Sequence, residues 1–271
     1  MIDIIIKRTP AFIKKYIKGQ IKNYKARTNP NYPPKYFCPI CRQDILEFKG
    51  LDRSLFEKWF EVRAIFSISQ LETINISKYS CPNCGANDRD RLYALYLKKM
   101  LPKEDKIKLL DIAPTHLQNY IKAFPNVIYR SMDLYKENVD DKLDITDMNI
   151  YKDEQFDVFI CSHVLEHVND DVKALKELFR ILKKDGWGIL MVPVHLDLNE
   201  IYENPTITDP DERWKHFGQN DHVRMYSKEG FIERVKSVGF NISQYNIEYF
   251  GEDVFEKNGI HKYSVLYIVT K

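Results

Sequence analysis

The sequence predicts an α/β protein built on a doubly wound, mostly parallel β-sheet. From residue 106 onward, short apolar runs alternate with amphipathic helical stretches, and aspartates follow the first two of these runs. Two close pairs of cysteines precede this region. With 271 residues, 44% of them hydrophobic, the chain can form one medium-sized domain and a small appendage.

The strands and helices follow from hydrophobic periodicity. The helix over 171–183 has one apolar face, and Gly186 just beyond it is expected to end that helix. The predicted strands span 108–113, 127–132, 156–161 and 188–194, with two more near 240–249 and 263–269. The other helices are predicted at 117–124 and 227–238. Ligands of such sheets bind beyond the carboxyl ends of the strands, so we expect the functional site there.

Residues 1–37 carry nine Lys or Arg and a single acid, a balance of +8 in a chain whose net charge is +2. Between Pro10 and Arg27 apolar side chains recur at helical spacing, which predicts a basic amphipathic helical arm. The arm would pack on its own domain, or contact a membrane surface or nucleic acid. Because no run of about 18 apolar residues exists and no signal peptide is evident, we expect a cytoplasmic protein.

Four of the five cysteines form two Cys-x-x-Cys knuckles, Cys38 with Cys41 and Cys81 with Cys84. Four thiolates complete a closed tetrahedral shell, so we predict a structural Zn²⁺ site. Reduced core cysteines or a redox pair are the alternatives, but neither pair resembles the start of a thioredoxin-type helix.

The 39 residues between the knuckles exceed the usual insert of a zinc ribbon. We expect a helix around 54–65 and a short strand at 73–79 within them. The zinc-knuckle subdomain is predicted to span 38–100.

An ordered series of aspartates marks a nucleotide-type pocket. Asp111 ends the first strand, and Asp133 ends the second about twenty residues later, where a carboxylate can accept both hydroxyls of an adenosine ribose. Asp144 is placed to meet the adenine amine. Each aspartate alone is more typical of a helix cap or a turn than of a ligand site, but their order along these strands favours ligand binding.

Several motifs together carry a specific resemblance. They are CPNCG at 81–85 followed by RDRL at 89–92, LDIAP at 110–114, SHVLEHV at 162–168, DP at 209–210, and FGQNDHVRMY at 217–226. From Cys38 to its end, the chain resembles class I S-adenosylmethionine-dependent methyltransferases of the type 11-like group, especially bacterial members with an N-terminal zinc knuckle. The resemblance implies a seven-stranded sheet and a catalytic domain spanning 101–271.

The resemblance also implies where S-adenosylmethionine binds. Its methionine end would lie over Asp111, Ala113, Pro114 and Thr115, its ribose on Asp133 with Leu134 beside it, and its adenine near Asp144 and Ile145, with Ser162 in the same pocket.

The loop Ala113-Pro114-Thr115-His116 replaces the usual glycine-rich turn, and Pro114 removes a backbone donor. We therefore expect side chains to replace the missing amide. Arg91 is the candidate for the cofactor carboxylate and Arg89 for an acidic group of the substrate, although both also suit an exposed helix start.

Histidines are the candidates for catalysis, because transfer to a hydroxyl requires loss of a proton. His163 directly follows a strand, and His222 lies in a polar segment, 199–226, that is predicted to be a lid without a core of its own. Arg224 and Tyr226 of this segment are expected to contact the acceptor. His167, at helical spacing from His163, suggests a metal pair but is interpreted as a packed residue.

The expected reaction is O-methylation of a small acceptor, one that is anionic or linked to a saccharide. The resemblance points to bacterial surface-polysaccharide or metabolite tailoring. Two alternatives stay open: an RNA methyltransferase that uses the knuckle and the basic arm, and a non-catalytic module that retains the fold. A nucleic-acid acceptor is disfavoured, since the segment after the 156–161 strand lacks the Asp/Asn-Pro-Pro-aromatic turn typical of amino-group methylation on bases.

Overall fold

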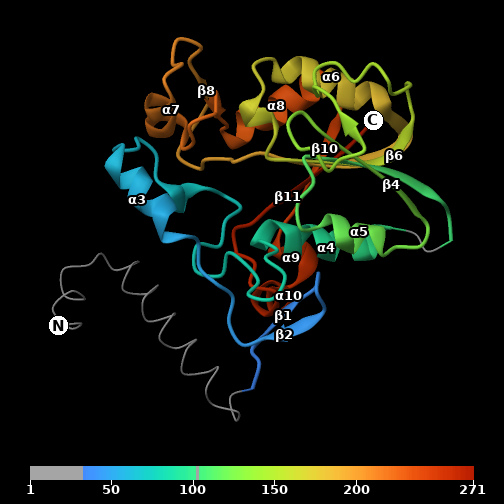
Figure 1. Cartoon of the computed structure of the whole chain (residues 1–271), viewed down its shortest axis with the longest axis horizontal. Coiled ribbons are helices and arrows are strands. Elements are labelled where there is room, and N and C mark those ends of the chain that lie inside the picture. Colours follow the sequence, from blue (N-terminus) through green and yellow to red (C-terminus); the bar gives the residue numbers. More distant parts are fainter. Residues whose placement is uncertain (1–32, 102–103) are drawn as a thin grey trace.

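The computed structural model of the protein describes residues 33–101 and 104–271 (Figure 1). The predicted basic helix between Pro10 and Arg27 lies outside the described residues. Within the described ranges, no helix combines the length and the hydrophobicity that a membrane crossing requires.

A seven-stranded sheet forms the centre of the molecule, with the strand order β10-β11-β7-β6-β3-β4-β5. The strands are β3 (Ile107–Ile112), β4 (Val127–Asp133), β5 (Asp141–Lys142), β6 (Phe156–Ser162), β7 (Leu182–Met191), β10 (Asn241–Tyr245) and β11 (Leu266–Thr270). Strands β3 to β7 pair in parallel, and β11 pairs antiparallel with both β7 and β10. The expected doubly wound, mostly parallel seven-stranded sheet is therefore confirmed.

Helices cover both faces of this sheet. Figure 1 shows α6 (Asp171–Ile181) and α8 (Lys228–Ser237) on one face, and α4 (Asp88–Met100), α5 (Gln118–Lys122) and α9 (Ile247–Phe250) on the other, with α10 (Glu252–Lys257) nearby. Leu92 and Leu97 of α4 lie in the same buried core as Leu109 and Phe159 of the strands. Helix α4, although within the range predicted for the zinc-knuckle subdomain, thus packs as part of the α/β core.

The predicted boundary between the 171–183 helix and the next strand is wrong. Helix α6 ends at Ile181, and β7 begins at Leu182 without a connecting loop. Gly186 lies inside β7, at an irregularity in its pairing with β6. A Cβ there would lie 2.8 Å from the Asp157 carbonyl oxygen and 2.8 Å from Leu182 Cδ1. This glycine therefore permits a close approach between strands and does not cap a helix.

The N-terminal part contains the hairpin β1 (Tyr36–Cys38) and β2 (Gln43–Ile45), the helix α3 (Arg53–Glu61) and the 3-10 helix η1 (Ile68–Gln70). Helix α3 accounts for the helix predicted at 54–65. The strand predicted at 73–79 does not form, because the Asn75 side chain accepts hydrogen bonds from Ser77 Oγ and the Lys78 backbone N–H and folds this stretch into a turn.

Candidate functional site

The residues predicted to bind the cofactor come together at one edge of the sheet. Strands β4, β3 and β6 are adjacent and parallel, with Ile112 paired to Met132 on one side and to Cys161 on the other. Their carboxyl ends therefore place the loop after Ile112, Asp133 and Ser162 side by side. This convergence is the feature that the acidic series in the sequence predicted.

The loop after β3 keeps a backbone shape that glycine usually supplies. Ala113 has φ of 55°, a left-handed conformation that disfavours residues with a Cβ. Two side chains hold the loop: Lys136 Nζ donates to the Pro114 carbonyl oxygen at 2.7 Å, and Thr115 Oγ1 donates to Asp90 Oδ1 at 2.7 Å. Side chains thus support the loop where glycines are missing.

Asp111 lies buried beneath this loop and accepts a hydrogen bond from the Tyr129 hydroxyl at 2.8 Å. Burial raises the pKa of its carboxyl to about 7, because a desolvated carboxylate loses its hydration. A cationic group placed beside Asp111, such as the ammonium of an amino acid, would favour the ionised form.

The carboxylates of Asp133 and Asp144 both serve local turns. Asp133 Oδ1 accepts the backbone N–H groups of Tyr135 and Lys136 at 2.7 and 2.9 Å, while its Oδ2 lies 3.8 Å from Lys136 Nζ. Asp144 Oδ1 accepts from the backbone N–H and the hydroxyl of Thr146. Leu134 is 46% exposed beside Asp133, and Ile145 is buried. The turns fix both carboxylates at the strand ends while keeping one apolar side chain accessible.

Arg89 and His163 meet at the end of β6. Arg89 Nη1 lies 2.8 Å from His163 Nε2, and the His163 backbone N–H donates to the Met191 carbonyl at 2.8 Å. His163 has φ of 57°, a strained conformation of the kind that concentrates at functional sites. Burial and the Arg89 charge lower the pKa of His163 to about 4, so its imidazole is neutral at physiological pH. The Tyr93 hydroxyl lies 2.9 Å from Ser162 Oγ in the same place.

Arg91 does not reach the cofactor side, contrary to the prediction. Its side chain is fully buried beside the cysteine knuckles, and its Cζ atom is 3.9 Å from the Phe48 ring centroid. All its hydrogen bonds go to backbone carbonyls, those of Asn258, Tyr79, Ala86, Lys78 and Gly259. With its guanidinium saturated, Arg91 joins the knuckle to the C-terminal part of the chain.

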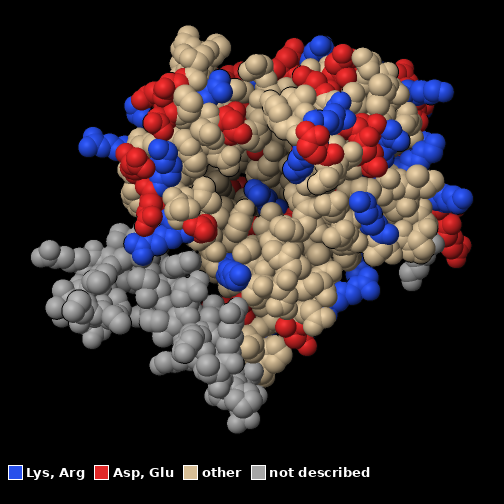
Figure 2. Space-filling model, in the orientation of Figure 1, with Lys and Arg blue, Asp and Glu red and all other residues tan. Residues whose placement is uncertain are grey.

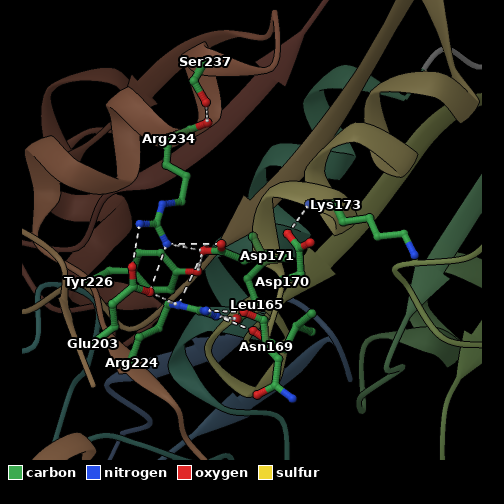
Figure 3. A network of polar contacts seen from close by, with 11 residues as sticks. Leu165, Asn169, Asp170, Asp171, Lys173, Glu203, Arg224, Tyr226, Arg234 and Ser237 are labelled. Carbon is green, nitrogen blue, oxygen red and sulfur yellow. Dashed lines mark hydrogen bonds and ion pairs between the residues drawn. The ribbon is translucent and has the colours of Figure 1, made fainter. Parts of the chain in front are cut away.

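Arg224 and Tyr226 are likewise unavailable to an acceptor (Figure 3). Arg224 is 4% exposed and donates to Glu203 Oε2 at 2.9 Å and to the carbonyls of Leu165 and Asn169, each at 2.8 Å. The Tyr226 hydroxyl donates to Asp171, which Arg234 also binds at 2.9 Å. The sequence shows that these polar residues are present, but only the fold determines whether their side chains face a ligand or other protein groups.

The segment 199–226 has structure of its own. It contains β8 (Tyr202–Glu203) paired antiparallel with β9 (Arg224–Met225), and the helix α7 (Pro210–Phe217) capped by Asp209. Phe217, His222 and β9 are buried, so the expectation of a segment without a core function is wrong for its second half.

Helix α7 also contacts α3. The Ile65 backbone N–H donates to the Lys215 carbonyl at 3.0 Å, and Lys58 Nζ lies 3.0 Å from Asp211 Oδ1. A Cβ on Gly218 would lie 2.7 Å from Trp59 Cζ2. Figure 2 shows that this face of the molecule is hollowed beside these elements, with Lys or Arg atoms inside the hollow.

Sequence reasoning missed Glu166, which lies in the 3-10 helix η2 (Leu165–His167). Its side chain is fully buried, with Oε1 3.1 Å from His163 Nδ1, and it forms a compact group with His167 and His222. Burial favours the protonated carboxyl, yet the adjacent histidines outweigh burial and hold the pKa of Glu166 below its usual range. The Glu-His dipeptide was the only signal, because His222 lies 56 positions from Glu166.

The four cysteines of the two knuckles converge as predicted. The sulfur atoms of Cys38 and Cys84 are 3.7 Å apart, and those of Cys41 and Cys81 are 3.9 Å apart. All four lie within 4.8 Å of one another. These separations exclude disulfides, whose sulfurs lie about 2.05 Å apart, and match the spacing of ligands around one ion.

One known protein family matches part of the chain. Residues 92–190, from α4 to β7, match the family described as a methyltransferase domain. No curated protein sequence matches the chain.

Among solved structures, the chain is similar to an S-adenosylmethionine-dependent methyltransferase from Archaeoglobus fulgidus (14% identity, 66% of this chain and 92% of that chain, TM-score 0.42). It is also similar to one from Mesorhizobium loti (14%, 65% and 96%, TM-score 0.41) and to the carbon methyltransferase CurJ (14%, 66% and 53%, TM-score 0.44). The match to the methyltransferase-domain family over residues 92–190, together with the order of the sheet, supports a methyltransferase enzyme that uses S-adenosylmethionine.

Proposed function

We propose that the protein transfers a methyl group from S-adenosylmethionine to a hydroxyl of a small acceptor that is anionic or linked to a saccharide. The observation that carries this proposal is the contact of 2.8 Å between Arg89 and His163 at the carboxyl end of β6. A guanidinium and a neutral imidazole there offer an anchor for an anion and an acceptor for a proton.

The cofactor, when bound, supplies an electrophilic methyl group on a sulfonium. The residues that would hold it are those at the strand ends. Asp111 would bind the amino-acid end, the loop from Ala113 to Thr115 would carry it, and Asp133 would bind the ribose. Leu134 and Ile145 would contact the adenine, with Asp144 accepting from its amine. Transfer in line with the acceptor then depends on alignment, for which a rigid set of strand ends is suited.

His163 would take the hydroxyl proton at one of its ring nitrogens. With a pKa of about 4 it is a weak base in the free protein, partly because Arg89 repels its protonated form. An anionic group of the acceptor on Arg89 would offset that repulsion and raise the basicity of His163. Proton transfer would thus improve when the correct acceptor is bound, which would add selectivity.

We further propose that the four-cysteine cluster holds a structural zinc ion. Zinc–sulfur bonds of about 2.3 Å in a tetrahedron require sulfurs about 3.8 Å apart. The separations of 3.7 and 3.9 Å agree with this value. Four sulfur ligands leave no open position, so the ion would support the fold and take no part in the reaction.

The motif resemblance favours tailoring of a bacterial surface polysaccharide or a metabolite. We would test this by incubating the protein with labelled S-adenosylmethionine and hydroxylated acceptors, including sugar phosphates, uronic acids and uncharged sugars, with RNA alongside. We expect label on an oxygen of an anionic acceptor. The Arg89→Gln variant should lose the preference for anionic over neutral acceptors and retain its affinity for the cofactor. Label on RNA, or on nitrogen, would contradict the proposal.

A further inference from the structure

A second cluster of metal-ligating side chains lies apart from the cysteines. One ligand atom from each of Glu166, His167 and His222 lies within 4.8 Å of the others. Two of these residues come from η2, directly after β6, and the third comes from the segment that leads into β9. The cluster is therefore assembled from two parts of the chain that only the fold brings together.

Glu166 is the residue that most needs a partner. Its side chain has no exposed surface, and within residues 33–101 and 104–271 neither carboxylate oxygen accepts a hydrogen bond. His163 Nδ1 lies 3.1 Å from Glu166 Oε1. A buried carboxylate is costly unless it is hydrogen-bonded, ion-paired or bound to a metal ion.

The two imidazoles are oriented as metal ligands are. His222 Nδ1 lies 2.9 Å from the Phe217 carbonyl oxygen, and His167 Nδ1 lies 3.1 Å from Asp221 Oδ2. Each ring thus directs Nδ1–H to a backbone carbonyl or a carboxylate, which leaves Nε2 as a lone-pair donor. The rings meet edge to face, with an interplanar angle of 82° and centroids 4.6 Å apart.

The surrounding structure holds the cluster in place without an ion. The Val223 backbone N–H donates to the Glu166 carbonyl oxygen at 2.9 Å, next to His222 in the chain. Arg224 then joins β9 to η2 through the Leu165 carbonyl (Figure 3). A site whose ligands are fixed by a surrounding shell of hydrogen bonds is preorganised for binding.

We propose that Glu166, His167 and His222 bind a divalent first-row transition-metal ion beside the pocket. Two imidazoles and one carboxylate suit Mn²⁺, Fe²⁺, Co²⁺, Ni²⁺ or Zn²⁺ better than Mg²⁺ or Ca²⁺, which prefer oxygen ligands alone. Three protein ligands leave coordination positions open, as in metal sites that bind small molecules. Resting on the function proposed above, the hydroxyl of the acceptor would occupy one of them and become more acidic.

Mn²⁺ is the probe that separates this site from the cysteines, because it binds nitrogen and oxygen ligands in preference to thiolates. We would saturate the protein with one equivalent of zinc and titrate it with Mn²⁺, following free Mn²⁺ by electron paramagnetic resonance. We expect one Mn²⁺ bound per chain in addition to zinc. Glu166→Gln and His222→Gln should each weaken binding at least tenfold, and Asp221→Asn tenfold or less.

His216→Gln is the matched control, since it changes a half-buried histidine of the same segment, whose Nδ1 lies 2.7 Å from the Tyr202 hydroxyl. It should leave Mn²⁺ affinity unchanged, and thermal unfolding should show that every variant is folded. Absence of binding beyond zinc, or binding that survives Glu166→Gln and His222→Gln in folded protein, would overturn the proposal. The titration uses neither cofactor nor acceptor, so a failure to bind Mn²⁺ would not contradict the proposed methylation. Conversely, a protein that binds Mn²⁺ but shows no methyl transfer would contradict the proposed function and not the metal site.

Discussion

The two clusters of metal-ligating side chains differ in the number of potential ligands, in the chemical softness of the ligand atoms and in their position in the fold. The cysteine cluster has four sulfur ligands on two turns outside the central sheet, whereas the cluster of Glu166, His167 and His222 has three harder ligands directly beyond β6. A complete shell of soft ligands suits an ion that supports the fold. An incomplete shell of nitrogen and oxygen ligands next to a pocket suits an ion that meets a substrate.

The largest expected effect tests the first cluster. Cys38→Ser removes one ligand of the proposed zinc and should lower the free energy of unfolding by several kcal/mol, on the order of 5, since metal binding and folding are coupled. Elemental analysis and denaturant unfolding measure both quantities. Cys161→Ala, in buried β6, is the control that should retain one zinc per chain. A well-folded, metal-free protein with four free thiols would remove the distinction between the clusters.

Arg224→Gln should act on the second cluster alone. The buried guanidinium joins β9 to η2, so its loss should cost about 3 kcal/mol of stability, as expected when a buried ionic network loses one member. Mn²⁺ affinity should fall with it, because His222 loses its position, while zinc content stays at one. Arg213→Gln, in the same segment, should change neither quantity. Unchanged Mn²⁺ affinity in folded Arg224→Gln would show that this arginine does not position His222.

Asp133→Ala should leave both clusters intact and weaken cofactor binding. We expect S-adenosylmethionine binding to weaken by about 1.5 to 3 kcal/mol, the range for hydrogen bonds to a charged group. Titration calorimetry measures this, with the exposed Asp147→Ala as the control. Equal affinity in both variants would mean that the ribose binds elsewhere.

Asp111→Asn sharpens the contrast with Glu166, since Asp111 is a buried carboxylate with a hydroxyl donor, Tyr129. Its pKa is raised to about 7 in the folded protein, above the unfolded value near 3.8, so folding is penalised at pH values above 7 and the penalty fades as pH falls towards 4. The amide removes the penalty but weakens the Tyr129 bond. We expect a net gain of roughly 1 to 2 kcal/mol at pH 8 in cofactor-free protein.

Denaturant unfolding at pH 8 and pH 5 tests this sign. The gain should shrink or reverse at pH 5. A gain that is equal at the two pH values would show that Asp111 is not the group that titrates.

The sequence predicted the sheet because its strands are buried on both faces and appear as apolar runs, such as Leu109 to Ile112. It placed the helix end at Gly186 wrongly, since a glycine needed for close strand packing looks the same as one needed for a cap. The roles of Arg91 and Arg224 could not be inferred, because a charge in the sequence does not reveal whether its partners are backbone carbonyls or a ligand.

The contact between α3 and α7 explains the unusual spacing of the cysteine knuckles. The 39 residues between them include Trp59, which packs against Gly218 at the end of α7. A compact zinc ribbon could be moved between proteins as an independent module, but this insert is long enough to contact the segment 199–226. Shortening it to ribbon length would retain the four cysteines and detach that segment, so knuckle and catalytic domain must be exchanged as one unit in any chimera.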